Sequence, residues 1–357
     1  MPDALSMPSG GAILTAALML LVFIGLLFLG SILLPGTRIN DQQGAFKFNG
    51  LALFLLSVLG AALAQMFGWF SLTVLYTHFV ALFIVANIFA FAACGWLYWR
   101  GASGADQPVG FLRGFFFGRE QNPACFGMDL KMFSYRPSLI GLALFNLSFA
   151  VVQYEQHGTL TPAMALYQAF TFLYVLNYFQ FERGMVYTWD IVSERFGWML
   201  VWGDYVLVPF FYCIAGWWLV DAPASSLSGG AVAGIVLLFL FGFWVFRGAN
   251  DQKHRFKQDP GANIWGKPAQ TLDGRLLVSG FWGIGRHLNY TGEICVYFAF
   301  VLTTGFVSWI PYLLPLWLIC LLAHRARRDE QRCRAKYGEL WERYKQRARF
   351  SMVPFLY

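Results

Sequence analysis

The chain has 357 residues, of which 58% are hydrophobic and only 13% are charged. Soluble globular domains carry about 25% charged residues, so this composition excludes an ordinary soluble protein and indicates a membrane protein. The net charge of +7 would suggest nucleic-acid binding in a soluble chain. Here the basic residues lie between long apolar runs, where they orient membrane helices, so we expect no nucleic-acid partner.

The apolar runs are long enough to cross a membrane as helices, because about 20 residues at 1.5 Å per residue span a hydrocarbon core of about 30 Å. The expected fold class is therefore all-α, a polytopic transmembrane helical bundle with about nine to ten membrane helices. The expected spans are 11–34, 51–68, 75–99, 137–154, 161–180, 199–220, 229–246, 292–308 and 310–323.

The segments between these spans carry most of the charge. Residues 35–50 are rich in Gly and polar side chains, which predicts a turn-rich polar loop. Residues 100–136 mix Phe with charged residues, as in a segment on the membrane surface that either caps a cavity or contacts a ligand. The basic loops share one side, which the positive-inside tendency makes cytoplasmic. Nine crossings then leave the N-terminus outside, and ten place it inside.

Two isolated polar residues lie near or inside apolar runs. His78 is either a hydrogen-bonded structural residue or a ligand contact. Asp204 is either the structural partner of a cation or part of a polar cavity. The six cysteines show neither CxxC pairing nor the spacing of a metal site, so no metal is expected.

Residues 276–290, LLVSGFWGIGRHLNY, hold more polar groups than a plain membrane anchor needs. The stretch is also too short and too rich in Gly for a confident crossing. Its GFWGIG sequence is not a dinucleotide-binding loop, because no strand-loop-helix unit surrounds it. We therefore interpret the stretch as part of a site, to which the charged tail at 324–345 must return.

The charged tail repeats functional side chains at helical spacing. Residues four positions apart lie on one face of a helix, and this face presents Arg325, Asp329, Cys333 and Tyr337. The alternative is a solvated helix with intrahelical ion pairs. We expect such solvated, intrahelical pairing for the residues that lie off this stripe, namely Glu330, Arg334 and Glu339.

The segment before residue 276 supplies positive charge. Lys253 and Lys257 are also four residues apart, and with Arg255 and Arg325 they suit a phosphorylated cofactor. An adenine needs a stacking surface, and a nicotinamide needs an apolar slot with amide-type partners. The side chains available for these roles are Trp282, Asn289 and Tyr290.

Several motifs together resemble one family. GANDQKHRFK, LLVSGFWGIGRHLNYTGE, HRARRDEQRCRAKYGELWERY and the final MVPFLY resemble the sterol reductases of the C14- and C7-reductase group, which includes the membrane domain of the lamin B receptor. Earlier in the chain, GREQNPACFGMDLKMFSYRP, ERGMVYTWDIVSERFGW and WGDYVLVPFFY resemble the same family. The resemblance covers most of residues 35–357.

This resemblance implies an NADPH-dependent reduction of a ring carbon-carbon double bond in a sterol intermediate, with C14 favoured over C7. It implies one membrane domain, 1–357, with N-terminal helices at 1–180 and a C-terminal cofactor-binding half at 181–357. By motif position, NADPH would be bound by Lys253, Lys257, Leu277, Trp282, Asn289, Tyr290, Arg325, Asp329, Cys333 and Tyr337. The sterol would enter from the lipid bilayer into a pocket near Tyr174, Glu182 and Asp190.

The chemistry of such a reduction sets its own requirements. An isolated alkene accepts hydride poorly, so a proton must arrive first or in concert with it. The site must therefore place an acid opposite the nicotinamide in a dry cavity. Asp329 or Tyr174 is the expected catalytic proton donor, because burial raises the pKa of a carboxyl group toward neutrality.

Two other functions compete with this interpretation. RHLNYTGE is also similar to the RHPxYxGE pattern of isoprenylcysteine carboxyl methyltransferases, although those enzymes are shorter. A non-catalytic sterol-binding or scaffold protein is a further alternative, but a scaffold has no need of the stripe that begins at Arg325. The expected partners are a sterol and membrane lipids. The short N-terminus and compact loops favour a bacterial cytoplasmic membrane over endoplasmic reticulum.

Overall fold

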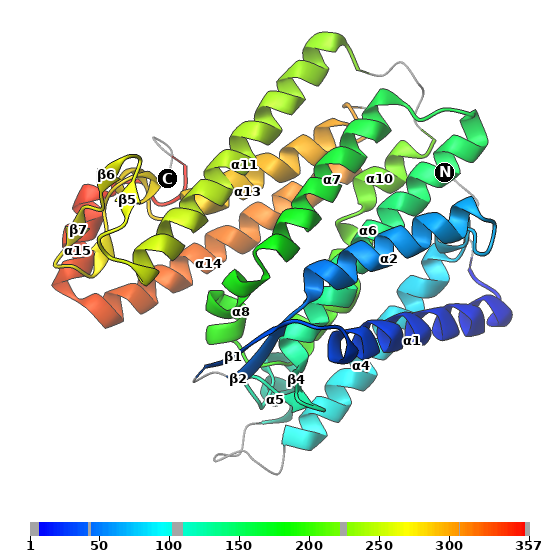
Figure 1. Ribbon diagram of the computed structural model, residues 1–357, viewed down its shortest axis with the longest axis horizontal. Coiled ribbons are helices and arrows are strands. Elements are labelled where there is room, and N and C mark those ends of the chain that lie inside the picture. Colours follow the sequence, from blue (N-terminus) through cyan, green and yellow to red (C-terminus); the bar gives the residue numbers. More distant parts are fainter. Residues whose placement is uncertain (1–6, 42–43, 102–109, 222–226, 307, 354–357) are drawn as a thin grey trace. The chain divides into compact units, whose positions relative to one another are not determined.

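The computed structural model describes residues 7–41, 44–101, 110–221, 227–306 and 308–353. The chain divides into two compact units, the N-terminal unit Met1–Ala222 and the C-terminal unit Pro223–Tyr357. In the described residues of each unit, helices dominate and the strands form two-stranded antiparallel hairpins (Figure 1). The predicted all-α class is confirmed.

Five helical segments in the described part of the chain are long and apolar enough to cross a membrane. They are α1 (Gly10–Leu33), α4 (Phe79–Arg100), α6 (Leu130–His157), the segment Trp198–Leu219 and α11 (Gly229–Gln258). Two shorter apolar helices are α2 (Gly50–Met66) and α13 (Leu288–Leu302). Two further helices, α7 (Pro162–Gln180) and α14 (Leu313–Tyr337), complete the long elements. This set makes the protein a polytopic helical membrane protein.

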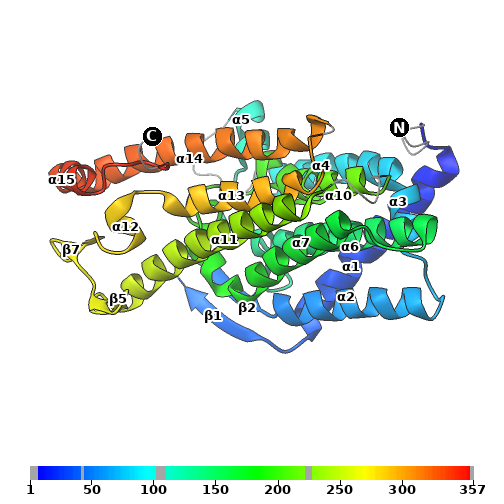
Figure 2. The same ribbon diagram turned by 90° about the horizontal axis from the view of Figure 1, so that it is seen from above.

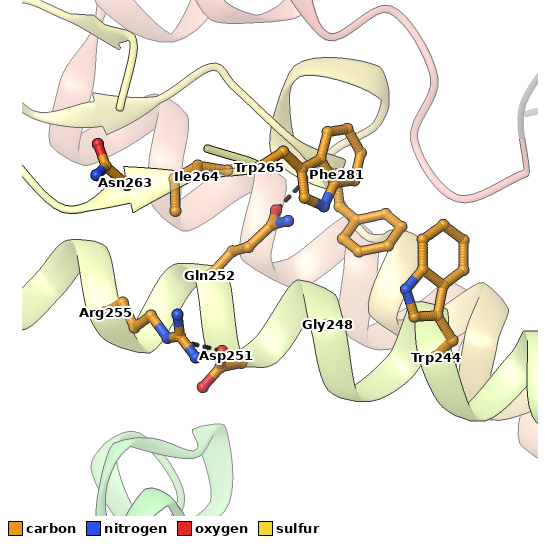
Figure 3. A pocket seen from close by; sticks show the side chains of 9 residues that line it. All are labelled: Trp244, Gly248, Asp251, Gln252, Arg255, Asn263, Ile264, Trp265 and Phe281. Atoms are coloured by element: carbon orange, nitrogen blue, oxygen red, sulfur yellow. Dashed lines mark hydrogen bonds and ion pairs between the residues drawn. The ribbon is translucent and has the colours of Figure 1, made fainter. Parts of the chain in front are cut away.

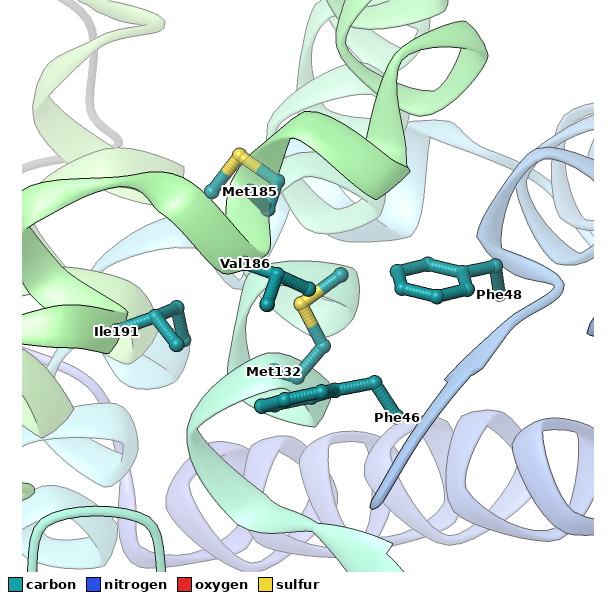
Figure 4. Close-up of a cluster of buried hydrophobic side chains, with 6 residues drawn as sticks. All are labelled: Phe46, Phe48, Met132, Met185, Val186 and Ile191. Atoms are coloured by element: carbon teal, nitrogen blue, oxygen red, sulfur yellow. The ribbon is translucent and has the colours of Figure 1, made fainter. Parts of the chain in front are cut away.

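The prediction of a polar loop at 35–50 was wrong. β1 (Thr37–Asp41) and β2 (Gly44–Phe48) form an antiparallel hairpin in which Thr37 lies opposite Phe48. Because side chains alternate along a strand, Phe46 and Phe48 share one face. Figure 4 shows how both rings enter a buried apolar cluster that also contains Met132, Met185, Val186 and Ile191.

Helix α6 begins seven residues before the predicted span. Asp129 caps it, because its Oδ1 accepts a hydrogen bond of 2.7 Å from the N–H of Met132. Burial raises the pKa of Asp129 to about 6. The helix ends at Gly158, whose φ of 70° lies in the left-handed region that favours glycine. The first turn also buries Lys131, whose Nζ donates to the backbone oxygens of Asp190 and Glu194 at 2.7 and 2.6 Å.

The segment Trp198–Leu219 is a broken helix. It consists of α9 (Trp198–Trp202), the π-helix η4 (Gly203–Phe211) and α10 (Ile214–Leu219). Asp204 is buried in the π-helix, where its Oδ2 accepts a hydrogen bond from the Ser134 hydroxyl on α6. His78 lies between α3 (Thr73–Thr77) and α4, and its Nδ1 is 3.2 Å from the backbone oxygen of Val74. That contact favours the structural interpretation of His78.

One buried ion pair connects four elements of the N-terminal unit. Arg136 on α6 is fully buried, and its Nη2 lies 3.0 Å from Oε1 of Glu182, which begins the 3-10 helix η3 (Glu182–Tyr187). The same Nη2 donates to the backbone oxygen of Lys47 in β2 at 2.6 Å. The other carboxylate oxygen of Glu182 accepts from the N–H of Gly50 at the start of α2, at 2.9 Å. The pair therefore fixes the hairpin, α2 and η3 against α6.

The C-terminal unit is built on α11 and α13, which lie side by side in both views (Figures 1 and 2). The close approach requires Gly242, because a Cβ there would lie 2.7 Å from Cβ of Cys295. Helix α11 continues to Gln258, beyond the apolar span that the sequence predicted to end at about residue 246. The connection to α13 contains β5 (Asn263–Ile264), β6 (Lys267–Pro268), β7 (Thr271–Leu272), β8 (Leu276–Leu277) and α12 (Phe281–Ile284).

Removing one member of the buried Arg136–Glu182 pair leaves an uncompensated charge. We expect Arg136→Ala to lower the free energy of unfolding by about 3–5 kcal/mol. Thermal unfolding of the detergent-solubilised protein measures this loss. Arg113→Ala, which removes an exposed arginine of the same unit, serves as the control and should behave as the unaltered protein. Equal unfolding of the two variants would show that the pair does not hold the unit together.

Candidate functional site

All ten residues predicted to bind the cofactor lie within the C-terminal unit. Lys253 and Lys257 occupy the last turns of α11, and Leu277 ends β8. Trp282 lies in α12, and the first turn of α13 carries Asn289 and Tyr290. The predicted stripe lies entirely on α14, with Tyr337 as its last residue.

The sequence predicted that the charged tail at 324–345 returns to the 276–290 stretch, and the structure shows this contact at Glu330 and again at the residues after the tail. After α15 (Glu339–Arg347), Phe350 forms a parallel bridge with Gly285. The N–H groups of Arg286 and His287 donate to the backbone oxygens of Phe350 and Ser351 at 3.0 and 2.8 Å. The predicted tail motif continues beyond this contact, and its residues 354–357 lie outside the described part of the chain.

Arg286 anchors this return through its side chain. The guanidinium is buried, with Nη2 2.6 Å from Oε1 of Glu330 on α14 and Nη1 2.7 Å from the backbone oxygen of Ala348. The expectation that Glu330 belongs to a solvated set of intrahelical ion pairs was therefore wrong. Arg334 also pairs between helices, with its Nη2 3.0 Å from Glu342 on α15. The motif residue Arg286 thus links α14, the chain end and α13.

Trp282 forms one wall of the site. Its Nε1 donates to the backbone oxygen of Ala249 on α11 at 2.8 Å, and its own backbone oxygen accepts from the Tyr344 hydroxyl at 3.1 Å. Lys253 Nζ lies 4.4 Å from the centre of the indole ring, which is a cation–π contact. Leu277 packs in the same buried cluster as Trp282. The structure therefore brings three predicted residues together and adds Tyr344, which the sequence analysis missed.

Asp329 faces two other groups of the site. Its Oδ2 lies 4.0 Å from Nε2 of His287 and 3.9 Å from Sγ of Cys333, one helical turn further along α14. Burial, reinforced by the carboxylate of Asp329, raises the pKa of Cys333 to about 12. Cys333 is therefore a thiol at neutral pH. It can donate a weak hydrogen bond, and it is not a nucleophile.

His287 is the second residue that the sequence analysis missed as a site residue. Its ring is buried and stacks on Tyr290, with ring centres 5.2 Å apart and planes 9° from parallel. Burial lowers the pKa of His287 to about 3, and the positive charges of Lys253 and Arg286 contribute to the shift. The imidazole is therefore neutral. The clue was its place in the RHLNY motif, two residues before Asn289, which the sequence analysis chose as a cofactor contact.

Among the described residues of this region, the buried polar atoms without a hydrogen-bond partner include Nε2 of His287 and Oδ1 of Asn289. The amide nitrogen of Asn289 is used, since Nδ2 donates to Oδ1 of Asn250 at 3.2 Å. Buried polar atoms in proteins are almost always paired, so two orphans beside a cation-rich cluster indicate that a polar ligand fits here.

Positive charge surrounds Asp329. Lys257 is within electrostatic range of Lys253, Lys336 and Arg332, with Asp329 as the opposing charge. Arg325 lies one turn before Asp329 on α14. Such an excess of cations suits the phosphate groups of a ligand. Among the described residues, no group of three or more His, Cys, Asp and Glu is arranged to hold a metal ion.

The three predicted sterol-site residues lie in the N-terminal unit. Tyr174 is buried on α7. Glu182 is buried and uses both carboxylate oxygens, one for Arg136 and the other for Gly50. Asp190 lies in α8 (Trp189–Val192) and accepts a hydrogen bond from the Tyr135 hydroxyl at 3.3 Å. Glu182 therefore has a role in holding the fold that its motif position did not reveal.

These observations define a class: a polytopic helical membrane protein whose C-terminal unit gathers cationic side chains around Asp329 and the buried His287. The ergosterol biosynthesis ERG4/ERG24 family model matches residues 12–357. The chain belongs to this family.

Named relatives agree with this assignment. The chain is 41% identical to a Delta(14)-sterol reductase of Methylotuvimicrobium alcaliphilum over 320 residues, which are 87% of this chain and 75% of that protein. It is 38% identical to a Delta(14)-sterol reductase of Arabidopsis thaliana, with 90% of this chain and 89% of that protein covered. It is 34% identical to a 7-dehydrocholesterol reductase of Danio rerio, with 91% and 74% covered.

The neutral state of His287 predicts a pH dependence of stability. Its pKa falls from 6.5 in the unfolded chain to about 3 in the folded protein. Below pH 6.5 the unfolded chain therefore gains a proton that the folded protein does not. Between pH 7.5 and 5 this costs the folded protein about 2 kcal/mol.

His287→Gln should remove this part of the acid sensitivity. Thermal unfolding measured between pH 7.5 and 5 tests it, with His157→Gln, an exposed histidine, as the control. The control should keep the full slope of the unaltered protein. A His287→Gln variant with the same slope would show that His287 is not the group responsible.

Proposed function

We propose that this protein is an NADPH-dependent sterol reductase that reduces the C14 double bond of a sterol intermediate. The observation that carries the proposal is the similarity, over most of the chain, to two proteins named Delta(14)-sterol reductase. The 7-dehydrocholesterol reductase relative supports C7 reduction as the second candidate, at lower identity. The sterol is proposed to enter from the lipid bilayer, and the bacterial relative supports a bacterial cytoplasmic membrane.

NADPH is the proposed cofactor because the residues of the C-terminal unit fit its parts. Lys253, Lys257 and Arg325 offer positive charge for phosphate groups, and Trp282 offers an aromatic face. The orphaned Oδ1 of Asn289 can accept from an amide, such as that of a nicotinamide. The remaining proposed contacts are Leu277, Tyr290, Asp329, Cys333 and Tyr337.

The chain's own residues have to supply a proton and exclude water. A bound NADPH supplies the hydride. Asp329 is the proposed proton donor, held between the neutral imidazole of His287 and the thiol of Cys333. The buried ring of His287 lies next to that carboxyl group, whose side chain is 28% exposed, so the bound cofactor and sterol have to exclude the remaining water. Tyr174 is the alternative donor, and Glu182 and Asp190 remain proposed contacts of the sterol.

A panel of sterols tests the reaction directly. The purified protein is incubated with NADPH and sterols that carry a 14-ene, a 7-ene or a 24-ene, and the products are identified by mass spectrometry. We expect conversion of the 14-ene. Exclusive conversion of the 7-ene would establish the second candidate, and no conversion of any sterol would contradict the proposed activity.

Replacing the proposed acid separates catalysis from binding. Asp329→Asn should lower turnover by about 10²- to 10⁴-fold, the usual contribution of a general acid, while NADPH still binds. Steady-state kinetics measure the turnover, and the fluorescence of the bound cofactor measures NADPH binding. Asp273→Asn, an exposed acid that pairs with Arg343 in the same unit, should retain activity. If Asp329→Asn kept full activity and Tyr174→Phe lost it, Tyr174 and not Asp329 would be the proton donor.

Lys257 is proposed to contact the 2′-phosphate, which distinguishes NADPH from NADH. Lys257→Ala should raise KM for NADPH by about tenfold, equivalent to about 1.4 kcal/mol, and change KM for NADH little. Initial-rate kinetics with both cofactors measure this. Lys267→Ala, an exposed lysine in β6, provides the matched control. An equal rise for both cofactors would place Lys257 away from the 2′-phosphate.

A further inference from the structure

The C-terminal unit contains a hollow of about 160 Å³ that shares no lining residue with the ten proposed cofactor contacts. Arg255, which the sequence analysis grouped with the cations for the cofactor, lines this hollow. It lies between α11 and the segment that carries β5 and α12 (Figure 3). Since a water molecule takes about 30 Å³ of liquid volume, the hollow matches about five waters, the size of a small headgroup and not of a four-ring sterol. Its lining residues are Trp244, Gly248, Asp251, Gln252, Arg255, Asn263, Ile264, Trp265 and Phe281.

Three aromatic rings follow one another along this hollow. The ring of Phe281 lies 5.0 Å from that of Trp244 and 5.0 Å from that of Trp265, and both contacts are edge-on. Gly248 permits this arrangement, because a Cβ there would lie 2.7 Å from the Phe281 ring. Gln252 holds the wall in place, since its Oε1 accepts from the N–H of Phe281 at 2.9 Å (Figure 3).

Trp265 occupies an unfavourable backbone position. It forms the two-residue turn of the β5–β6 hairpin together with Gly266, and the two residues have φ of 51° and 78°. Turns with positive φ at both central positions prefer Asn-Gly or Gly-Gly, and a bulky residue there is strained. Asn at residue 265 would therefore make this turn more stable than Trp does. The strain therefore points to a function for the indole.

The hollow also carries one acid and one base. Asp251 and Arg255 are one turn apart on α11, with Oδ2 and Nε separated by 2.8 Å. The carboxylate and the electron-rich ring faces disfavour a free anion and favour a cation. Arg255 in turn favours a phosphate. A ligand with both an ammonium and a phosphate group offers each member of this ion pair a further partner of opposite charge.

Helix α11 also provides a path for apolar chains. Leu237, Phe241 and Trp244 are exposed, with relative exposures of 67%, 53% and 56%. Together with Asp251 and Arg255 they recur at intervals that keep them on one helical face. Because α11 is long and apolar enough to span a membrane, this face runs from an apolar surface to the charged hollow.

We propose that this hollow binds the headgroup of a phospholipid that carries an ammonium group. The ammonium lies against Trp244, Trp265 and Phe281 next to Asp251, the phosphate binds Arg255, and an acyl chain follows α11. The site is independent of the proposed reductase activity, because its residues take no part in that mechanism.

Native mass spectrometry of the full-length protein in detergent tests this site. The protein is titrated with phosphatidylethanolamine, phosphatidylcholine or phosphatidylglycerol that have the same acyl chains. We expect the two ammonium lipids to be retained more strongly than phosphatidylglycerol. Equal retention of all three lipids, or retention of a sterol in their place, would overturn the proposal.

Two variants separate the headgroup site from folding. Trp265→Asn installs the residue that the turn prefers, so thermal stability should be equal or higher while ammonium-lipid retention falls about fivefold. Asp251→Asn should reverse the preference toward phosphatidylglycerol, because Arg255 then dominates. The control Trp99→Asn removes an exposed indole at the end of α4 and should change neither the thermal stability nor the lipid retention. Unchanged lipid retention in both hollow variants would refute the assignment.

Discussion

The C-terminal unit depends on one buried cation, Arg286. Its guanidinium pairs with the carboxylate of Glu330 on α14 and donates to the backbone oxygen of Ala348. Its backbone N–H donates to the backbone oxygen of Phe350. A buried charge that loses its partners costs several kcal/mol, so the chain end cannot leave this position without a large penalty. The same contacts fix the neighbouring His287 and hold α14 close to it. The geometry around Asp329 therefore follows from a residue that contacts Asp329 only indirectly.

Burial gives the site its chemical character. Removing water from His287 keeps its ring neutral, and removing water from Cys333 keeps its sulfur protonated. Neither side chain then carries a charge, and the lysines at the end of α11 provide the positive charge around Asp329. A site of this kind can bind a polyanionic ligand and still hold a proton beside an apolar substrate.

The sequence predicted the helical class well, because long apolar runs admit few alternatives in a membrane. It also predicted that the tail returns to the 276–290 stretch, since both segments carry polar groups that need partners. It missed the β1–β2 hairpin, because the alternating Phe46 and Phe48 were outweighed by glycine and polar residues. The Arg286–Glu330 pair was missed because spacing along one helix reveals intrahelical partners and not tertiary ones. The placement of the sterol residues remains a proposal.

Helix α11 has to serve two different surfaces, and its periodicity explains how. Lys253 follows Asp251 by two residues, a rotation of about 200°, so the two side chains leave opposite sides of the helix. Lys257 and Arg255 repeat this division one turn later. The helix therefore has to remain regular to Gln258, well beyond its apolar part, for either surface to form. A ligand that binds one side of these last turns restrains the backbone that also carries the side chains of the other side. The proposed headgroup and the proposed cofactor would therefore contact the same helix from opposite sides.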